Sequence, residues 1–325
     1  MIYLDSAATT FQKPPTVARA MTEALSTMSS PGRGGHPLAM RAADTAFQCR
    51  SELAALGADI SAADAPPFDR ETAVAAFERL IVPGIDAVIC NHVSNVFGCI
   101  QPIEAVAELC RDRGVPLIVD ISQSAGILPL DMERLGAAFI AMPGHKGLYG
   151  PQGTGILLCG GDGLPAALLE GGTGSISLSQ EMPDFLPDRL EAGTHNMPGI
   201  AGLLAGVRFV RRRGTDRILR HEQMLTRRTA ELLRTLPAVE VFAAPEGKQQ
   251  AGVLSFRVRG RDPELIGEAL AERGIAVRAG LHCAPLAHRS AGTLNTGTVR
   301  VSFSAFNAPG DCEGLYYALR EAIKK

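Results

Sequence analysis

The sequence has little net charge and no long apolar run, and each absence narrows the class of protein. Its 325 residues carry a formal net charge of -2, so charge gives no reason to expect a nucleic acid or an acidic membrane as partner. No apolar stretch is long enough to span a bilayer. The first residues, 1–6, show no basic segment followed by an apolar one, so we expect no signal peptide.

Cysteines are few and irregularly spaced. The chain has seven, an odd number, which favours reduced thiols in the cytoplasm over a disulfide framework. His282, Cys283 and His288 match no common zinc pattern and have no evident fourth ligand, so we expect no metal site. Cys90 and Cys110 lie on apolar faces of predicted elements and are expected in the core.

Apolar strand-like runs alternate with helical patterns in the first half of the chain. Pro102 and Gly114 bound one such helix. The predicted strands span residues 86–92, 116–120, 137–142 and 153–158. This alternation predicts an α/β fold, with a mostly parallel sheet covered by helices on both faces.

The pattern changes after about residue 205. Predicted strands at 251–258, 275–278 and 298–303 flank a helix that Asp262 and Pro263 begin, which indicates a smaller α+β domain. A chain of this length, 46% hydrophobic, is long enough for two domains. We therefore expect a large cofactor-binding domain at 15–205 and a small domain formed by 1–14 and 206–325.

Lys146 is the residue that indicates most about the chemistry of this protein. It follows the apolar run 138–142 in a turn framed by glycines, and Asp120 ends the preceding predicted strand. Pyridoxal phosphate needs such a pair, because a lysine binds its aldehyde and an aspartate keeps its pyridinium nitrogen protonated. Ligands of parallel sheets bind beyond the carboxyl ends of the strands. Asn95, Asp120 and Lys146 are all expected there.

Other interpretations of this glycine-rich run fit less well. A Walker-type phosphate loop needs Ser or Thr after the lysine, and Gly147 stands there. The spacing of Gly150, Gly153 and Gly155 is not that of the dinucleotide fingerprint. A lysine that simply points into solvent stays an alternative, but Asp120 and Gln123 together favour the cofactor.

Ordered motifs along nearly the whole chain resemble one family. They lie at residues 3–10, 30–34, 92–98, 120–123, 144–146, 191–196, 278–285 and 300–307. Examples are the segments Gly144-His145-Lys146 and Leu281-His282-Cys283-Ala284-Pro285. The chain resembles the cysteine desulfurase-like members of the class V aminotransferases, which are pyridoxal phosphate enzymes of fold type I. The resemblance implies that fold and a transferase activity.

The resemblance also implies a set of cofactor-binding residues. Lys146 resembles the lysine that forms the Schiff base, and Asp120 resembles the partner of the pyridinium nitrogen. Asn95 and Gln123 resemble groups near the ring hydroxyl and the substrate, and His145 resembles a phosphate contact. With Thr194, the implied cofactor-binding residues are Lys146, Asp120, Gln123, Asn95, His145 and Thr194.

Further roles follow from the same resemblance. Thr194 resembles a threonine that contacts the phosphate in the other subunit, which implies a homodimer. Arg300 resembles the clamp for the substrate carboxylate, with Asn95 as a second substrate contact, and its planar fork suits that task. Cys283 matches the sulfur-accepting nucleophile. The implied catalytic residues are Lys146, Cys283 and Asp120.

One unit of this family is missing from the sequence. Members carry a strand-helix-strand unit whose Thr-rich turn holds the cofactor phosphate at a helix N-terminus. Here Leu56 is followed directly by Gly57, and no Ser/Thr-rich turn between a strand and a helix occurs at 50–85. The segment is absent from the recorded sequence, deleted from the gene, or lost in a shortened homologue.

The expected reaction is removal of sulfur from L-cysteine, with L-alanine as product and a persulfide on Cys283. Arg278 and His282 are candidates to favour the Cys283 thiolate, since a free thiol is mostly protonated at neutral pH. A sulfur-acceptor protein is a possible partner. Selenocysteine lyase, C–S lyase and aminotransferase activities on the same fold stay open, as does a catalytically silent homologue.

Overall fold

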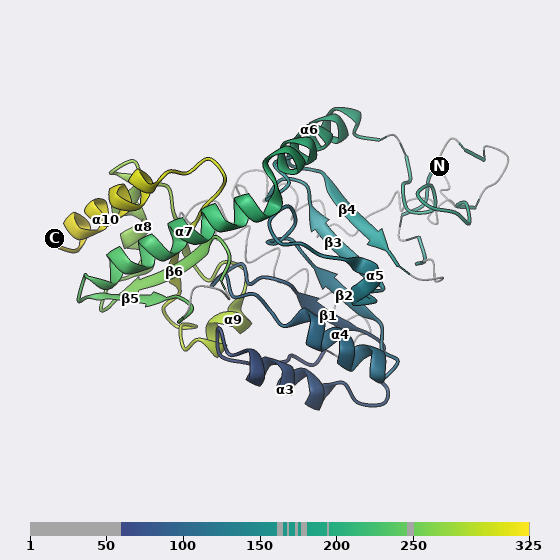
Figure 1. The fold of residues 1–325 in the computed structure, drawn as a ribbon, viewed down its shortest axis with the longest axis horizontal. Coiled ribbons are helices and arrows are strands. Elements are labelled where there is room, and N and C mark those ends of the chain that lie inside the picture. Colours follow the sequence, from purple (N-terminus) through teal and green to yellow (C-terminus); the bar gives the residue numbers. More distant parts are fainter. Residues whose placement is uncertain are drawn as a thin grey trace, which may run out of the picture.

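Two four-stranded sheets organise the part of the chain that the structure describes. The computed structural model describes residues 60–160, 165–167, 169–172, 175–176, 181–193, 195–245 and 250–324. The two sheets lie next to one another, and helices pack on both (Figure 1). The predicted junction at Leu56 and Gly57 and the predicted phosphate contact Thr194 lie outside the described residues.

The first sheet carries the predicted cofactor site. Its strands are β1 (Val88–Asn91), β2 (Leu117–Asp120), β3 (Phe139–Pro143) and β4 (Gly155–Cys159), in that spatial order. β1, β2 and β3 are parallel, whereas β4 pairs antiparallel with β3. The predicted mostly parallel α/β sheet is confirmed, and its one antiparallel strand lies next to the turn that contains Lys146.

Helices between these strands make the parallel pairing possible. α4 (Ile103–Asp112) connects β1 to β2, and α5 (Met132–Leu135) connects β2 to β3. α3 (Arg70–Leu80) begins after Asp69, whose carboxylate accepts a hydrogen bond from the Thr72 amide at 2.9 Å. The apolar face of α4 is buried as its spacing predicts: Ile103, Val106, Ala107 and Cys110. They pack with inward-facing strand residues in one core.

The second sheet is antiparallel throughout. Its strands are β5 (Val239–Phe242), β6 (Val253–Val258), β8 (Thr298–Ser302) and β7 (Arg278–Gly280), in that spatial order. Residues of β6 are buried at five of six positions, because helices cover one face of this strand and the segment after β1 packs on the other. The predicted smaller α+β part of the fold therefore has the expected architecture.

Three helices cover the second sheet: α7 (Thr215–Arg234), α8 (Pro263–Ala271) and α10 (Pro309–Lys324). Their apolar faces and the strands share a second core. A short helix, α9 (Pro285–Ser290), follows Cys283. Among the helices within the described ranges, none is long and apolar enough to cross a membrane.

The helix α6 (Met197–Arg213) supports the turn that contains Lys146. Gly214, with a φ of 86°, separates α6 from α7. Gly206 of α6 lies so close to the Leu148 carbonyl that a side chain there would overlap with it. Because α6 continues across residue 205, the domain limits at 15–205 and 206–325 stay a prediction.

Candidate active site

Three of the predicted site residues follow the carboxyl ends of neighbouring strands. Asp120 is the last residue of β2, Asn95 follows β1, and Lys146 follows β3. Because β1, β2 and β3 are parallel, these three ends share one edge of the sheet. The Asp120 carboxylate accepts a hydrogen bond from the Ser122 amide at 2.7 Å, which fixes its orientation at this edge.

A tight turn holds Lys146. The Lys146 carbonyl accepts a hydrogen bond from the Tyr149 amide at 2.9 Å, and the Gly144 carbonyl accepts one from the Gly150 amide at 2.8 Å. A side chain at Gly147 would overlap with the Ala125 carbonyl, so the turn lies against the segment after β2. Backbone bonds and close packing therefore fix the Lys146 backbone, while the residue as a whole is exposed and its amine is partly shielded from water.

The surroundings lower the pKa of Lys146. The largest cause is partial removal of the amine from water, which disfavours the charged form. Asp120 opposes this effect, while Arg300 and Arg278 add to it. More of the amine is therefore neutral than in an ordinary lysine, which favours attack on a carbonyl.

Arg300 connects the second sheet to the first. Its Nη1 donates a hydrogen bond to the Asn95 carbonyl at 2.8 Å, and Asn95 Nδ2 donates one to the His282 carbonyl at 2.8 Å. Burial, and then the neighbouring Arg278, lower the pKa of Arg300 to about 10. Arg300 is therefore charged at neutral pH. Its Nε is buried without a hydrogen-bond partner among the described residues, and a carboxylate would supply one.

Cys283 lies on the loop after β7, beside the two arginines. Its side chain is exposed, and Arg278 Nη2 lies 3.5 Å from its sulfur. Arg278 and Arg300 are opposite one another in the pairing of β7 with β8. A guanidinium at this distance stabilises negative charge on sulfur. The predicted association of Arg278 with Cys283 is present in the structure, whereas the role of Cys283 stays a prediction.

The remaining predicted residues are less defined. His145 is exposed beside Lys146, and Gln123 is half-buried shortly after Asp120. Near the undescribed Thr194, His195 Nδ1 lies 3.6 Å from a Glu191 carboxylate oxygen. The contacts of His145 and Thr194 with the cofactor phosphate, and of Gln123 with its ring, stay predictions.

Two hydroxyls beneath the Cys283 loop were not predicted from the sequence. Ser255 of β6 and Thr298 of β8 are fully buried and bonded to one another. The available signal is a polar residue at a buried position of an otherwise apolar strand. No group of three metal-binding side chains occurs among the described residues.

These residues fit pyridoxal phosphate at its aldehyde and ring. Lys146 supplies an amine with a lowered pKa, and Asp120 supplies a carboxylate close enough to influence that amine. For the phosphate, His145 stays a predicted contact, and the sequence predicts no helix N-terminus of the kind that the resemblance implies. The described residues therefore fit the aldehyde and ring of the cofactor well, whereas fewer of them are available for its phosphate.

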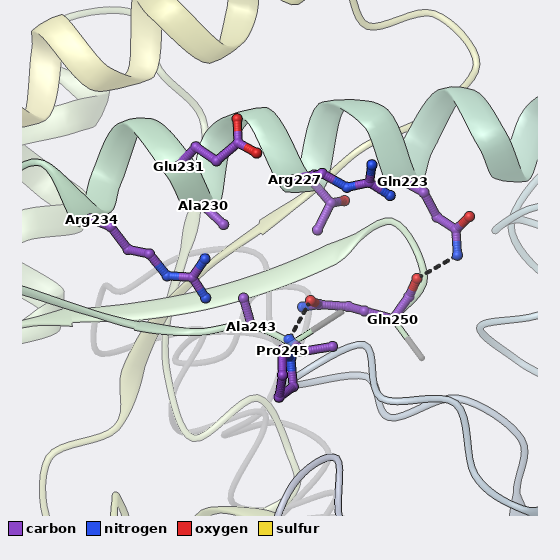
Figure 2. Close-up of a pocket in the computed structure, with 10 residues that line it drawn as sticks. Gln223, Arg227, Ala230, Glu231, Arg234, Ala243, Pro245 and Gln250 are labelled. Atoms are coloured by element: carbon purple, nitrogen blue, oxygen red, sulfur yellow. Dashed lines mark hydrogen bonds between the residues drawn. The ribbon is translucent and has the colours of Figure 1, made fainter. Parts of the chain in front are cut away.

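A separate hollow lies on the second sheet, away from these residues (Figure 2). It has a volume of about 260 Å³ and lies between α7 and the end of β5. Arg227, Glu231 and Arg234 of α7 project along one side, and Gln250 lies on the other. The Gln250 amide is already bonded to the carbonyls of Phe97 and Val253. None of the strand-end residues lines this hollow, so it is not the candidate active site.

Comparison with known proteins identifies the family. A family model described as "Aminotransferase class-V" matches residues 55–315. The chain belongs to this family. The match covers most of the chain and includes Asn95, Asp120, Lys146, Cys283 and Arg300, so the resemblance of the sequence to class V aminotransferases is confirmed.

Several relatives are described as cysteine desulfurases. A probable cysteine desulfurase of Methanothermobacter thermautotrophicus is 29% identical over 98% of this chain and 94% of its own length. One of Mycolicibacterium paratuberculosis is 36% identical over 75% of this chain, but only 36% of that protein is covered. The apo structure of a cysteine desulfurase from Thermococcus onnurineus NA1 superposes with a TM-score of 0.71, at 29% identity, over 98% of this chain and 93% of that one. The fold is therefore that of the cysteine desulfurases.

The first alignment also bears on the missing unit. It spans 382 positions, whereas the whole chain has 325 residues. Several dozen positions of this relative therefore have no counterpart in this chain. This shortfall is what the loss of one strand-helix-strand unit would produce, and that loss stays a prediction.

Proposed function

We propose that this chain is a pyridoxal phosphate-dependent cysteine desulfurase that converts L-cysteine to L-alanine and receives the sulfur on Cys283. The observation that carries the proposal is the position of Cys283, with Arg278 Nη2 3.5 Å from its sulfur and Arg300 opposite Arg278 in the sheet. An aminotransferase needs no thiol there. The relatives' description as probable cysteine desulfurases supports the same choice.

Arg300 is proposed to hold the substrate carboxylate. Its Nη1 is engaged with the Asn95 carbonyl, so the guanidinium is oriented before the substrate arrives. Its Nε has no hydrogen-bond partner among the residues that the structure describes. A carboxylate is the natural acceptor for this group, because it is anionic and planar. The amino acid would then extend from Arg300 toward Lys146.

Lys146 is proposed to bind the cofactor aldehyde and afterwards to move the substrate α-proton. Asp120 is proposed to hold the proton on the pyridine nitrogen. When bound, pyridoxal phosphate supplies an electron-withdrawing ring that stabilises the negative charge left by the departing proton. The lowered pKa of Lys146 suits both tasks, because an amine that has lost its proton can attack a carbonyl and accept a proton.

The sulfur transfer needs Cys283 as a thiolate. Its sulfur attacks the substrate sulfur, and a new S–S bond forms between them. The bond from the substrate sulfur to its β-carbon breaks, and its electron pair stays with the carbon fragment, which takes up a proton to become alanine. Cys283 retains the sulfur as a persulfide. Because Cys283 is exposed, a small thiol or an acceptor protein would be able to remove this sulfur.

Product analysis tests this proposal against the other activities. The purified chain, supplied with pyridoxal phosphate and L-cysteine, is expected to form alanine and protein-bound persulfide in equal amounts during the first turnover. Pyruvate and ammonia would indicate a C–S lyase instead. Amino-group exchange with an added 2-oxo acid would indicate an aminotransferase, and no product at all would indicate a silent homologue. A higher rate with L-selenocysteine would indicate a selenocysteine lyase.

A homodimer is part of the proposal, and α6 supplies a surface that supports it. Four large apolar side chains of this helix are each between 37% and 59% exposed. Their spacing of three, four and three residues places them on one side of the helix. They are Met197, Ile200, Leu204 and Val207. An apolar stripe of this kind is typical of a protein–protein interface.

Leu204→Glu is expected to shift the protein from dimer to monomer at micromolar concentration, because a carboxylate cannot be buried without a partner. Ala205→Glu is the matched control, since it adds the same charge one residue away on the same helix. Sedimentation velocity measures both. A wild-type monomer at micromolar concentration would contradict the homodimer.

The location in the cytoplasm stays a prediction. It rests on the odd number and irregular spacing of the cysteines, six of which are free thiols among the described residues.

A further inference from the structure

The loop that carries Cys283 has an unusual backbone. His282 and Cys283 have φ angles of 52° and 58°, so two consecutive residues other than glycine lie in the left-handed region. Residues with a side chain disfavour this region, because the Cβ atom approaches the backbone closely. Such conformations persist only where the surrounding structure holds them. Something must therefore fix this loop.

A buried chain of hydrogen bonds runs beneath the loop. Ser255 Oγ donates to the Val96 carbonyl at 2.6 Å, and Thr298 Oγ1 donates to Ser255 Oγ at 3.3 Å. Since the Thr298 hydroxyl proton is used in this way, its oxygen accepts from His282 Nε2 at 3.1 Å. His282, Thr298 and Ser255 are all buried. Because the chain ends at a carbonyl, which can only accept, it fixes which nitrogen of His282 carries the proton.

The backbone of His282 has a second attachment to the same segment, which follows β1. Asn95 Nδ2 donates to the His282 carbonyl at 2.8 Å. Asn95 and Val96 are neighbours in sequence, so the side chain and the carbonyl of His282 are both bonded, directly or through the chain, to this one segment. The Arg300 guanidinium donates to the Asn95 carbonyl as well. The segment therefore fixes the position of the Cys283 loop relative to Arg300, the proposed clamp for the substrate carboxylate.

A second histidine completes the environment of His282. The His288 ring centroid lies 5.6 Å from that of His282, and His288 Nδ1 lies 2.8 Å from Thr293 Oγ1. Burial lowers the pKa of His288 to about 4. The pKa of His282 also lies well below its ordinary value, first because of burial and then because of Arg300. Both rings are therefore neutral at physiological pH and add no positive charge beside the arginines.

We propose that His282, Thr298 and Ser255 are positioning residues, whose buried hydrogen bonds hold the Cys283 loop in its left-handed conformation with the sulfur beside Arg278. This inference rests on the proposed function for its consequence in turnover, but the position of the sulfur can be tested without turnover. When one of these hydrogen bonds is removed, the loop loses the contacts that keep its backbone in the disfavoured region. The sulfur then spends less time beside the guanidinium that stabilises its anion.

Thr298→Val is the decisive variant, because valine has nearly the shape of threonine and lacks the hydroxyl. Thr298→Ser restores the hydroxyl and serves as the rescue variant. Thr229→Val is the matched control, since Thr229 is a fully buried threonine of α7 that takes no part in these hydrogen bonds beneath the Cys283 loop. Ser255→Ala interrupts the same chain at its other end and replaces Thr298→Val if that variant does not fold. All are made in the full chain, with thermal melts to confirm folding.

Two measurements are made on each variant. The first is the rate at which iodoacetamide alkylates Cys283 at neutral pH, followed by peptide mapping so that other cysteines do not contribute. The second is the pair kcat and KM for L-cysteine. Thr298→Val is expected to lower the alkylation rate and kcat roughly tenfold, the effect of losing one buried hydrogen bond, with KM changed by less than about twofold. Thr298→Ser and Thr229→Val are expected to match the wild type.

Three outcomes would overturn the proposal. They are a wild-type alkylation rate in folded Thr298→Val or Ser255→Ala, a change confined to KM, and a failure of Thr298→Ser as large as that of Thr298→Val, which would assign the effect to packing. If the wild type forms no persulfide from L-cysteine, the proposed function fails. The alkylation rates then still decide whether His282, Thr298 and Ser255 position Cys283.

Discussion

Cys283→Ser is expected to lower persulfide and alanine formation from L-cysteine by at least about a thousandfold, the usual order for loss of a covalent nucleophile. Serine has nearly the same size but a much weaker nucleophile, because its hydroxyl does not ionise at neutral pH. The visible absorption of the bound cofactor should be retained, since Cys283 lies on the loop after β7 whereas Lys146 follows β3. Persulfide is measured by mass spectrometry of the intact protein.

Cys159→Ser is the matched control for this variant. Cys159 is a free and partly exposed cysteine at the end of β4, in the first sheet. It should keep wild-type activity, because nothing places it near Arg278 or Arg300. Sulfur release that continues undiminished in Cys283→Ser would rule out the assigned role.

Lys146→Ala is expected to abolish turnover by a similar factor and to remove the covalent attachment of the cofactor. Reduction of the wild-type holoprotein with borohydride, followed by peptide mapping, should place the pyridoxyl group on Lys146. Lys146→Arg is expected to be as inactive as Lys146→Ala, because a guanidinium keeps the positive charge but does not lose its proton at neutral pH. The comparison separates the chemistry of the amine from its charge.

Lys324→Ala is the control for this experiment. Lys324 is at the end of α10, where its amine is 2.8 Å from a Glu321 carboxylate oxygen. Its loss should leave activity and cofactor attachment unchanged, since exposed ion pairs contribute little. A pyridoxyl label on a lysine other than Lys146 would defeat the assignment.

The local parts of the fold and site could be predicted from the sequence. The helix bounded by Pro102 and Gly114 was predicted from the sequence, and α4 lies there with four apolar residues buried on one face. Asp120 and Lys146 were expected at one sheet edge because each follows an apolar run, and parallel strands end on the same side. In each case the signal lies within a short stretch of chain.

Contacts between distant segments could not be predicted in the same way. Arg300 donates to Asn95, and Ser255 donates to Val96, across more than a hundred residues of sequence. The strand predicted at 275–278 is instead paired only from Arg278 onward. Ile275 and Val277 are apolar because they pack on the second core, not because they belong to a strand. The spacing of apolar residues indicates which residues are buried, but it does not indicate which residues pair with a neighbouring strand.

The two arginines on β7 and β8 bring like charges together in the folded protein. Arg278 and Arg300 are directly opposite one another, and Arg278 contributes to lowering the pKa of Arg300. Two like charges brought together on folding repel, and this repulsion disfavours the folded state while no anion is present. A carboxylate placed on the arginines cancels the repulsion as it binds. If Arg300 holds the substrate carboxylate as proposed, part of the affinity for amino acids comes from relief of this repulsion, and an anion that cannot react should stabilise the fold for the same reason.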